Sequence, residues 1–332
     1  MSKIVNVILT GGIGSRLWPL SRKSNPKQYL EIFENKSLFE RTILRNQSFA
    51  DSVLVVGNKD NYNKSISVLQ KIESNAVHIV ESTPRNTAAA IAFAALHSDP
   101  EDILLISPSD HIIEGEKQYH DSVAKAIELA KQDYIVTFGI VPTKPETGYG
   151  YIEYYKEDVV AFREKPDAKT AEEFLSKGNF LWNSGMFCFK AKILLEELQQ
   201  FNPEVLATAR TTMTSAENGL LNEELSLLIP SISIDYAVME QSKKMKVVPA
   251  TFKWSDLGSF ESVYDYLITT GHKVDGNGNM VIGTEIPTEF LGMQDVIFVH
   301  TKDANLILKK TDSQAVKDIY LRLETNKSDL IN

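Results

Sequence analysis

The alternation of apolar strands with amphipathic helices constrains the fold of this chain more than any other feature. Five strand-like runs alternate with helix-like segments over residues 3–140: KIVNVILT, SVLVVGN, AVHIVES, DILLISP and YIVTFGI. The intervening segments have apolar residues at helical spacing. This pattern predicts an α/β fold with a doubly wound, mainly parallel sheet. Ligands of such sheets bind beyond the carboxyl ends of strands, where residues 11–16 and 109–111 are expected to converge.

The second half of the chain has a different pattern. Paired short strands, YGYIEYY, DVVAFREKP and GMFCFKA, indicate antiparallel additions to the sheet between residues 148 and 190. After residue 273, short pieces rich in Gly, Val and Ile precede a terminal helix, SQAVKDIYLRLE. The segment GHKVDGNGN has loop composition and places a domain boundary near Gly271. We therefore expect one domain over residues 1–270 and a second over residues 271–332.

Charge and composition exclude several classes of protein. The chain has 35 Lys and Arg against 44 Asp and Glu, a net charge of −9, so it is a poor candidate for a general nucleic-acid binder, which would need a basic face. A local cluster of basic groups could still bind an anionic small molecule. Its longest apolar stretch, residues 88–96, is too short to cross a bilayer, and its start has no signal-peptide pattern. We expect a cytoplasmic protein with no membrane partner. A single cysteine, Cys188, excludes an internal disulfide and predicts a buried, inert thiol.

A glycine-rich loop follows the first strand, in the segment GGIGSRLWPLSRKSNPKQYL. Glycines in such a turn let main-chain N–H groups approach phosphate oxygens closely. The segment lacks the Gly-Lys-Ser/Thr of a P-loop, and Leu17 stands where a dinucleotide fingerprint has its third glycine. Arg16 and Lys27 instead place two cations beside the turn, which suits a triphosphate. The alternative is a tight turn with surface cations.

Two further segments carry chemistry. In SPSDH, Asp110 follows a strand, where a carboxylate is suited to Mg²⁺, whereas a packing role is favoured for His111. In FREKP, Glu164 and Lys165 are adjacent on an expected strand, so their side chains should point to opposite faces. One could then accept sugar hydroxyls while the other meets a phosphate. An exposed ion pair is the alternative reading of this pair.

Taken in order, several segments resemble one known family: GGIGSRLWPLSRKSNPKQ, SPSDH, PETGYGYIE, FREKP, LWNSGMF, SIDYAVME and WSDLGS. Over about residues 3–265 the sequence resembles the mannose-1-phosphate guanylyltransferases of the sugar-nucleotidyltransferase superfamily. The resemblance implies a Rossmann-like nucleotidyltransferase domain with a mixed, mainly parallel sheet. It also implies a short C-terminal left-handed β-helix and a homodimer. Many relatives carry a second, sugar-isomerase domain, and this chain is expected to be monofunctional.

The implied reaction transfers GMP from GTP to α-D-mannose 1-phosphate with Mg²⁺, giving GDP-mannose and diphosphate. Three other functions are alternatives to it. Another nucleotide-sugar pyrophosphorylase could use the same site with a different base or sugar. A nicotinamide-dependent dehydrogenase fits the βαβ start but is disfavoured by the missing third glycine and by Arg16 and Lys27. A regulatory nucleotide-binding protein should have lost Lys27, Asp110 or Lys165, which are all present.

The resemblance also assigns roles to individual residues. Arg16 and Lys27 would hold the β- and γ-phosphates, Asp110 and Asp256 would share Mg²⁺, and Lys165 would bind the sugar phosphate. The residues expected to contact the nucleotide are Gly11, Gly12, Gly14, Ser15, Glu81, Asn86 and Ser109, and those expected to contact the sugar are Gly150, Glu164 and Asn183. Ser109 stands where many relatives have Ala. Asp256 has an alternative role, because Ser255-Asp256 precedes an expected helix and could cap it.

Glu81 is expected to select the base. It follows the third strand and precedes Pro84-Arg85-Asn86-Thr87, a loop that lies by the base in the superfamily. Guanine presents N1–H and N2–H₂ donors on one edge, and a carboxylate can accept both, whereas adenine presents an acceptor there. A surface glutamate is the alternative.

Overall fold

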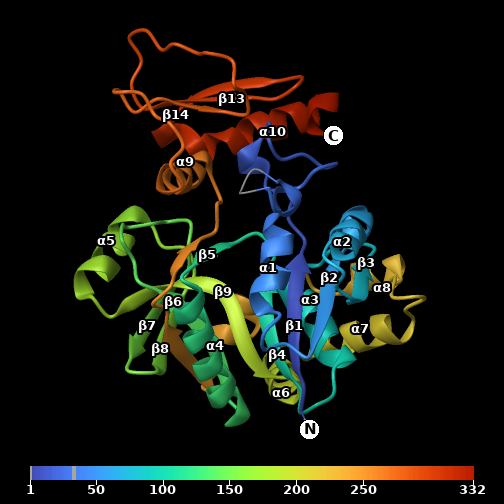
Figure 1. Cartoon of the computed structure of the whole chain (residues 1–332). Coiled ribbons are helices and arrows are strands. Elements are labelled where there is room, and N and C mark those ends of the chain that lie inside the picture. The colour runs from blue at the N-terminus through green and yellow to red at the C-terminus, as the bar shows by residue number, and fades with distance from the viewer. Residues whose placement is uncertain (1, 32–34) are drawn as a thin grey trace. The chain divides into compact units, whose positions relative to one another are not determined.

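The computed structural model describes residues 2–31 and 35–332, which form two compact units (Figure 1). Unit 1 comprises Met1–Gly11, Thr42–Ser109 and Ile113–Trp254, and unit 2 comprises Gly12–Arg41, Asp110–Ile112 and Ser255–Asn332. Within the described residues, no helix has both the length and the apolar character needed to cross a membrane.

Unit 1 is built on a nine-stranded sheet with the order β3-β2-β1-β4-β9-β6-β10-β8-β7. Its strands are β1 (Ile4–Thr10), β2 (Ser52–Asn58), β3 (Val77–Glu81), β4 (Ile103–Pro108), β6 (Ile135–Ile140), β7 (Tyr151–Tyr155), β8 (Asp158–Arg163), β9 (Phe180–Lys190) and β10 (Met245–Pro249). The strands expected from the sequence are confirmed, including the antiparallel additions β7, β8 and β9.

The sheet is mixed, and the expectation of a mainly parallel sheet needs correction. Strands β3, β2, β1 and β4 are parallel, and β10 is parallel to β6. The long strand β9 lies between β4 and β6 and is antiparallel to both. It therefore interrupts the parallel part of the sheet. The apolar pattern of a strand indicates that both of its faces are buried, but it does not indicate which strand is its neighbour in the sheet.

Alternate side chains of the strands enter two cores, one on each face of the sheet. Leu104 and Ile106 of β4 belong to the first core, and Ile103 and Leu105 belong to the second. The helices of the first core are α3 (Asn86–His97), α6 (Ala191–Phe201) and α7 (Pro203–Thr214), and those of the second are α4 (Glu116–Lys131) and α5 (Ala168–Lys177). Cys188 is a free thiol buried in the second core, as expected, and its burial raises its pKa.

Four further helices and one small sheet precede residue 256. The helices are α1 (Leu38–Asn46), α2 (Lys59–Lys71), α8 (Glu223–Leu228) and the π-helical turn η3 (Asp235–Met239). The short strands β5 (Ile112–Glu114) and β11 (Lys253–Ser255) pair with each other.

Unit 2 contains a three-stranded sheet and several short helices. Its elements are η1 (Ser15–Leu17), η2 (Lys27–Tyr29), α9 (Phe260–Thr269), β12 (Met280–Ile282), β13 (Val296–His300), β14 (Asn305–Lys309), η4 (Lys310–Ala315), α10 (Val316–Thr325) and η5 (Asp329–Ile331). Strand β13 pairs parallel with β12 and antiparallel with β14. A β-helix requires successive parallel pairings, so the left-handed β-helix stays a prediction.

The core of unit 2 joins segments that are far apart in the sequence. Leu17, Trp18 and Leu38 share one apolar cluster with residues of α9, of the three-stranded sheet and of α10. The domain boundary expected near Gly271 therefore lies inside unit 2, and the compact units do not coincide with the expected domains. Segments that follow residue 271 are packed on the same core as the segment that carries the glycine-rich loop.

Gly139 in β6 allows the close packing of neighbouring strands in unit 1. A Cβ atom at this position would lie 2.5 Å from Cδ1 of Leu181 and 2.9 Å from Cγ2 of Val247. We expect Gly139→Ala to lower the free energy of unfolding by about 1–3 kcal/mol, because the two strands must move apart. Urea denaturation measures this effect. Gly276→Ala is the control, since no atom lies within 4 Å of its Cβ position. Equal stability of the two variants would contradict the prediction.

Candidate active site

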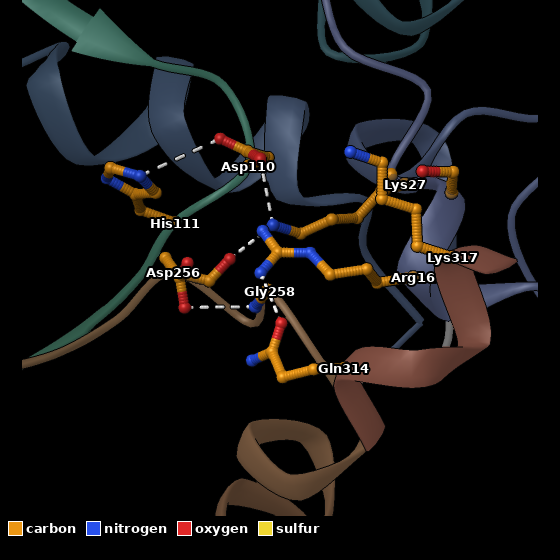
Figure 2. Close-up of a pocket in the computed structure, with 10 residues that line it drawn as sticks. Arg16, Lys27, Asp110, His111, Asp256, Gly258, Gln314 and Lys317 are labelled. Atoms are coloured by element: carbon orange, nitrogen blue, oxygen red, sulfur yellow. Dashed lines mark hydrogen bonds and ion pairs between the residues drawn. The ribbon is translucent and has the colours of Figure 1, made fainter. Parts of the chain in front are cut away.

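Unit 2 contains a cavity of about 530 Å³. Figure 2 shows it with the side chains that surround it, drawn from the glycine-rich loop, from the segment after β4, and from residues 256–317. The lining residues are Gly14, Ser15, Arg16, Lys27, Asp110, His111, Asp256, Gly258, Gln314 and Lys317. The sequence had singled out six of these for the site: Gly14, Ser15, Arg16, Lys27, Asp110 and Asp256.

The glycine-rich loop folds back on the segment that carries Lys27. The main-chain N–H of Lys27 donates to the carbonyl oxygen of Ile13 at 3.0 Å. Gly14 has a φ of 77° and directly precedes η1. A Cβ atom on Gly14 would lie 2.6 Å from Cβ of Lys27. Glycine is thus required here both by the left-handed backbone and by the contact with Lys27.

Lys27 connects the two expected magnesium ligands. Its side chain is only 5% exposed, and its Nζ lies 2.8 Å from Oδ2 of Asp110. The same Nζ also donates to the main-chain carbonyl oxygen of Asp256. A buried ammonium group needs such partners, because its desolvation is otherwise unfavourable. The contact ties Asp110 and the Asp256 segment to the glycine-rich loop.

Asp110 is held in its ionised form. Burial by itself would raise the pKa of this carboxyl, but the nearby charge of Lys27, together with His111 and hydrogen bonds, lowers the pKa below its usual value. About a third of the side chain, 36%, is still exposed. Nε2 of His111 lies 3.8 Å from Oδ1, too far for a hydrogen bond, and the His111 ring is buried. An ionised, accessible carboxylate is suited to a divalent cation.

Asp256 does not cap helix α9. Ser259 is the N-cap, with Ser262 completing a reciprocal capping box, so the capping role that the sequence left open for Asp256 is wrong. Oδ1 of Asp256 accepts a hydrogen bond from the main-chain N–H of Gly258 at 2.9 Å. Asp256 and Asp110 both line the cavity, which gives it two carboxylates from distant parts of the chain.

Two side chains of the cavity were missed by the sequence analysis. Gln314 in η4 and Lys317 in α10 line it, and Nη1 of Arg16 donates to Oε1 of Gln314 at 2.8 Å. Both are exposed side chains of a terminal amphipathic segment. In the sequence such residues are indistinguishable from a solvated face, so no signal could have identified them.

A second group of expected residues gathers in unit 1, at the ends of β7 and β8 and in β9. The main-chain N–H of Asn183 donates to the carbonyl oxygen of Gly150 at 2.8 Å. A Cβ atom on Gly150 would lie 3.0 Å from Oε2 of Glu164. Nδ2 of Asn183 also donates to Oδ1 of Asp235 at 3.1 Å. The structure thus brings Gly150, Glu164 and Asn183 together.

Asp235 joins this group although the sequence analysis gave it no role. Burial raises the pKa of Asp235 to about 6, and the carboxylate of Glu164 contributes to the rise, against the lowering effects of Lys165 and Asn183. The residue occurs in the SIDYAVME segment, which the resemblance includes. That segment was a signal that could have found it.

Glu164 and Lys165 differ from the expected arrangement. Strand β8 ends at Arg163, so neither residue lies on the strand, and Lys165 has a φ of 24°. The two side chains form an ion pair with each other and do not point to opposite faces. The Glu164 side chain is 11% exposed, whereas that of Lys165 is 62% exposed. The backbone turn after β8, before Pro166, removes the strand alternation on which the expectation rested.

Glu81, at the end of β3, is buried with only 4% of its surface exposed, so the surface alternative is wrong. Among the described residues, no donor reaches its Oε1. Burial raises the pKa of Glu81 to about 7, although a main-chain hydrogen bond involving Arg85 lowers it. A buried carboxyl group with an unused acceptor is suited to bind a ligand's donors.

The remaining expected residues occupy separate positions. Asn86 begins α3, and its side chain accepts a hydrogen bond from the main-chain N–H of Thr87 at 2.8 Å. Ser109 is buried after β4, and its main-chain N–H donates to the carbonyl oxygen of Leu9 at 3.2 Å. No atom lies within 4 Å of the Cβ position of Gly11 or Gly12, which leaves their backbone accessible. Asn86, Ser109 and Gly11 belong to unit 1, and Gly12 belongs to unit 2.

The chain is similar to known proteins over most of its length. A family profile described as nucleotidyl transferase matches residues 5–271. Mannose-1-phosphate guanylyltransferase 2 of Escherichia coli O157:H7 is 37% identical, over 97% of this chain and 73% of that protein.

Two solved structures are also similar. A structure described as mannose-1-phosphate geranyltransferase from Thermus thermophilus has a TM-score of 0.83 and 28% identity, covering 97% of this chain and 99% of that one. A structure described as mannose-6-phosphate isomerase from Helicobacter pylori has a TM-score of 0.70 and 38% identity, covering 76% of this chain and 99% of that one.

The close contact between Gly14 and Lys27 can be tested by measuring the pKa of Asp110. In Gly14→Ala the added methyl group displaces Lys27, so we expect the pKa of Asp110 to rise towards its ordinary value. Titration of the Asp110 carboxyl by carbon NMR measures this. Gly178→Ala is the control, because Gly178 also has a positive φ, 71°, but has no atom within 4 Å of its Cβ position. A pKa that is the same in Gly14→Ala and in the wild type would refute the close contact.

Proposed function

Because the chain belongs to the nucleotidyl transferase family, we propose that it transfers GMP from GTP to α-D-mannose 1-phosphate, releasing diphosphate. The observation that carries this proposal is the cavity in which Lys27 connects Asp110 to the Asp256 segment beside the glycine-rich loop. The substrates are suggested by the name of the Escherichia coli relative, mannose-1-phosphate guanylyltransferase 2.

In this reaction an oxygen of the sugar phosphate attacks the α-phosphorus of GTP. A bond forms between that oxygen and phosphorus, the bond from the α-phosphorus to the bridging oxygen breaks, and diphosphate leaves with the bonding electrons. Both reactants are anions, so catalysis depends on positioning and on neutralisation of charge. Arg16 and Lys27 supply cations at the glycine-rich loop for the phosphates that leave. No covalent nucleophile on the protein is required.

The cavity fits a magnesium ion. Asp110 is ionised and accessible, and Asp256 presents a second carboxylate to the same cavity. Mg²⁺ is commonly held by one or two carboxylates together with phosphate oxygens, so these two residues would hold it. When bound, the ion would neutralise charge on the reacting phosphates.

Unit 1, considered by itself, presents groups suited to a sugar and to a guanine base. Glu164 and Asn183 offer an acceptor and a donor for sugar hydroxyls, beside the carbonyl oxygen of Gly150. The exposed ammonium group of Lys165 is available for the sugar phosphate once its pairing with Glu164 is exchanged. Glu81 offers a buried carboxyl group for the N1–H and N2–H₂ donors of guanine.

The proposal extends to assembly and location. The chain acts as a cytoplasmic homodimer, with residues 1–270 as the catalytic domain and residues 271–332 as a partial β-helix with a terminal helix. The parallel pairing of β12 with β13 is the contact that supports a β-helical turn.

A substrate panel tests the proposed reaction. Diphosphate release is measured with GTP, ATP, CTP and UTP, each against mannose, glucose and galactose 1-phosphates. We expect the highest kcat/KM for GTP with mannose 1-phosphate. A second arm follows the conversion of mannose 6-phosphate to fructose 6-phosphate, because a similar structure is described as an isomerase of that substrate. Isomerisation without diphosphate release would overturn the proposal.

The role of Glu81 predicts a pH dependence. Its pKa is raised to about 7, so below that pH the carboxyl takes up a proton and can no longer accept both guanine donors. We expect KM for GTP in the wild type to rise by about tenfold for each pH unit below the pKa. Glu81→Gln should remove this dependence and reduce the preference for GTP over ATP.

The matched control for Glu81 is Glu172→Gln, an exposed glutamate of α5. Comparison with the wild type at each pH separates the Glu81 effect from the titration of GTP itself. The assignment of Glu81 would be wrong if Glu81→Gln kept both the wild-type preference for GTP and the wild-type pH profile.

The two carboxylates of the cavity should act as a unit. We expect Asp110→Asn or Asp256→Asn to remove most of the rate and the double variant to lose little more, because either change disrupts the same ion site. A double-mutant cycle of kcat/KM at saturating Mg²⁺ measures the coupling. Additive losses in activation free energy, or near-normal activity of folded Asp256→Asn, would show that the two groups do not share an ion.

A further inference from the structure

The cavity of unit 2 includes two side chains from outside the family-wide part of the chain. The family profile ends at residue 271, whereas Gln314 and Lys317 come from η4 and α10. Neither Gln314 nor Lys317 has a role in the proposed function described above. They therefore raise the question of what the terminal segment contributes to substrate binding.

Lys317 brings a further positive charge to the cavity. Lys27 is paired with Asp110, and Arg16 donates to Gln314, a neutral amide. Among residues 2–31 and 35–332, no carboxylate forms an ion pair with Lys317. The cavity thus contains three cations, Arg16, Lys27 and Lys317, against the two carboxylates Asp110 and Asp256, although the whole chain has a net charge of −9.

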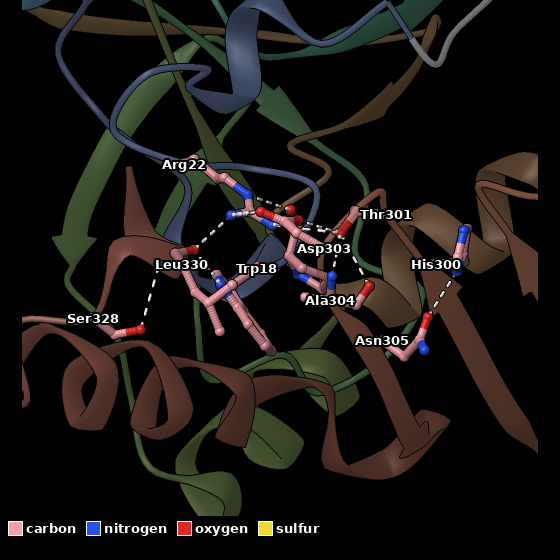
Figure 3. Close-up of polar contacts among 10 residues, drawn as sticks. Trp18, Arg22, His300, Thr301, Asp303, Ala304, Asn305, Ser328 and Leu330 are labelled. Atoms are coloured by element: carbon pink, nitrogen blue, oxygen red, sulfur yellow. Dashed lines mark hydrogen bonds and ion pairs between the residues drawn. The ribbon is translucent and has the colours of Figure 1, made fainter.

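The terminal segment that carries Lys317 is firmly attached to the chain just after the glycine-rich loop, as Figure 3 shows. Nε1 of Trp18 and Nη1 of Arg22 each donate to the carbonyl oxygen of Leu330 at 2.9 Å. The main-chain N–H of Lys23 donates to the carbonyl oxygen of Ile331, also at 2.9 Å. These contacts hold the residues that follow α10 against the segment that follows Arg16.

An ion pair with Asp303 also connects the segment after the glycine-rich loop to the turn between β13 and β14. Both terminal nitrogens of Arg22 donate to Asp303, at 2.6 and 3.0 Å, in a two-pronged arrangement, and the Arg22 side chain is only 11% exposed. Arg22 also donates to Pro19 and to Thr301. These contacts fix the segment that carries Arg16 and Lys27 to the segment that carries Lys317 within unit 2. The cavity is therefore organised before any ligand binds.

We propose that Lys317 binds the two terminal phosphates of the nucleotide, and the diphosphate formed from them, together with Arg16 as oriented by Gln314. The excess of cations matches a multiply charged diphosphate better than a sugar monophosphate. The contact between Arg16 and Gln314 places Lys317 beside the glycine-rich loop. In the proposed function, on which this inference rests, that loop faces the phosphates that leave.

The test compares Lys317→Met with Lys309→Met, an exposed lysine of β14 that does not line the cavity. We expect Lys317→Met to raise KM for GTP, and KM for diphosphate in the reverse reaction, by roughly 10–100-fold, as for loss of a charged hydrogen bond. KM for mannose 1-phosphate and for GDP-mannose should stay within about twofold of the wild type. Lys317→Arg should restore most of the affinity, because it retains the charge.

Binding of inorganic diphosphate, measured by titration calorimetry without other substrates, separates this inference from the proposed reaction. If the wild type made no GDP-mannose, the proposed reaction would fail, whereas weaker diphosphate binding by Lys317→Met would still support the role of Lys317. Unchanged diphosphate affinity in Lys317→Met would overturn the inference. An equal rise in KM for all four substrates would also overturn it, since that outcome indicates general disruption of the site.

Discussion

The burial of one ammonium group, that of Lys27, determines how the cavity of unit 2 is built. An amine removed from water must be compensated by acceptors, and Lys27 takes them from Asp110 and from the carbonyl oxygen of Asp256. These partners are 83 and 229 residues away in the sequence, so a single side chain fixes three distant segments. The lack of a side chain at Gly14 lets Lys27 approach closely enough to make both contacts.

Much of this arrangement could be predicted from the sequence, because the signals were local. Strand and helix patterns identified the elements of unit 1, and glycines next to cations identified a loop that lines the cavity of unit 2. The family resemblance implied that Asp110 and Asp256 belong to one site, and both line the same cavity. The position of β9 between β4 and β6 was not predicted, since the apolar pattern of a strand specifies its burial and not its neighbours.

The residues that were missed or misplaced share a physical cause. Lys317 and Gln314 are exposed, and an exposed helical position has the same sequence pattern whether it faces bulk water or a ligand cavity. Glu164 and Lys165 were assigned to opposite faces of a strand, but the strand ends one residue before them and the left-handed backbone at Lys165 lets the two side chains meet. In both cases tertiary structure decides the direction of a side chain, and the local sequence does not.

The way the last residues are attached has a consequence for how this chain can vary. Trp18, Arg22 and the main chain of Lys23 all contact carbonyl oxygens of residues 330 and 331, which every amino acid possesses. These hydrogen bonds do not depend on the side chains of the two residues, although Ile331 is buried in the core of unit 2 and Leu330 packs against it, so both must stay apolar. The hydrogen bonds do depend on the spacing between Lys317 and residue 330. A single inserted or deleted residue within α10 rotates everything beyond it by about 100° and shifts it by about 1.5 Å. The length of this terminal segment is therefore as constrained as the apolar side chains that it buries.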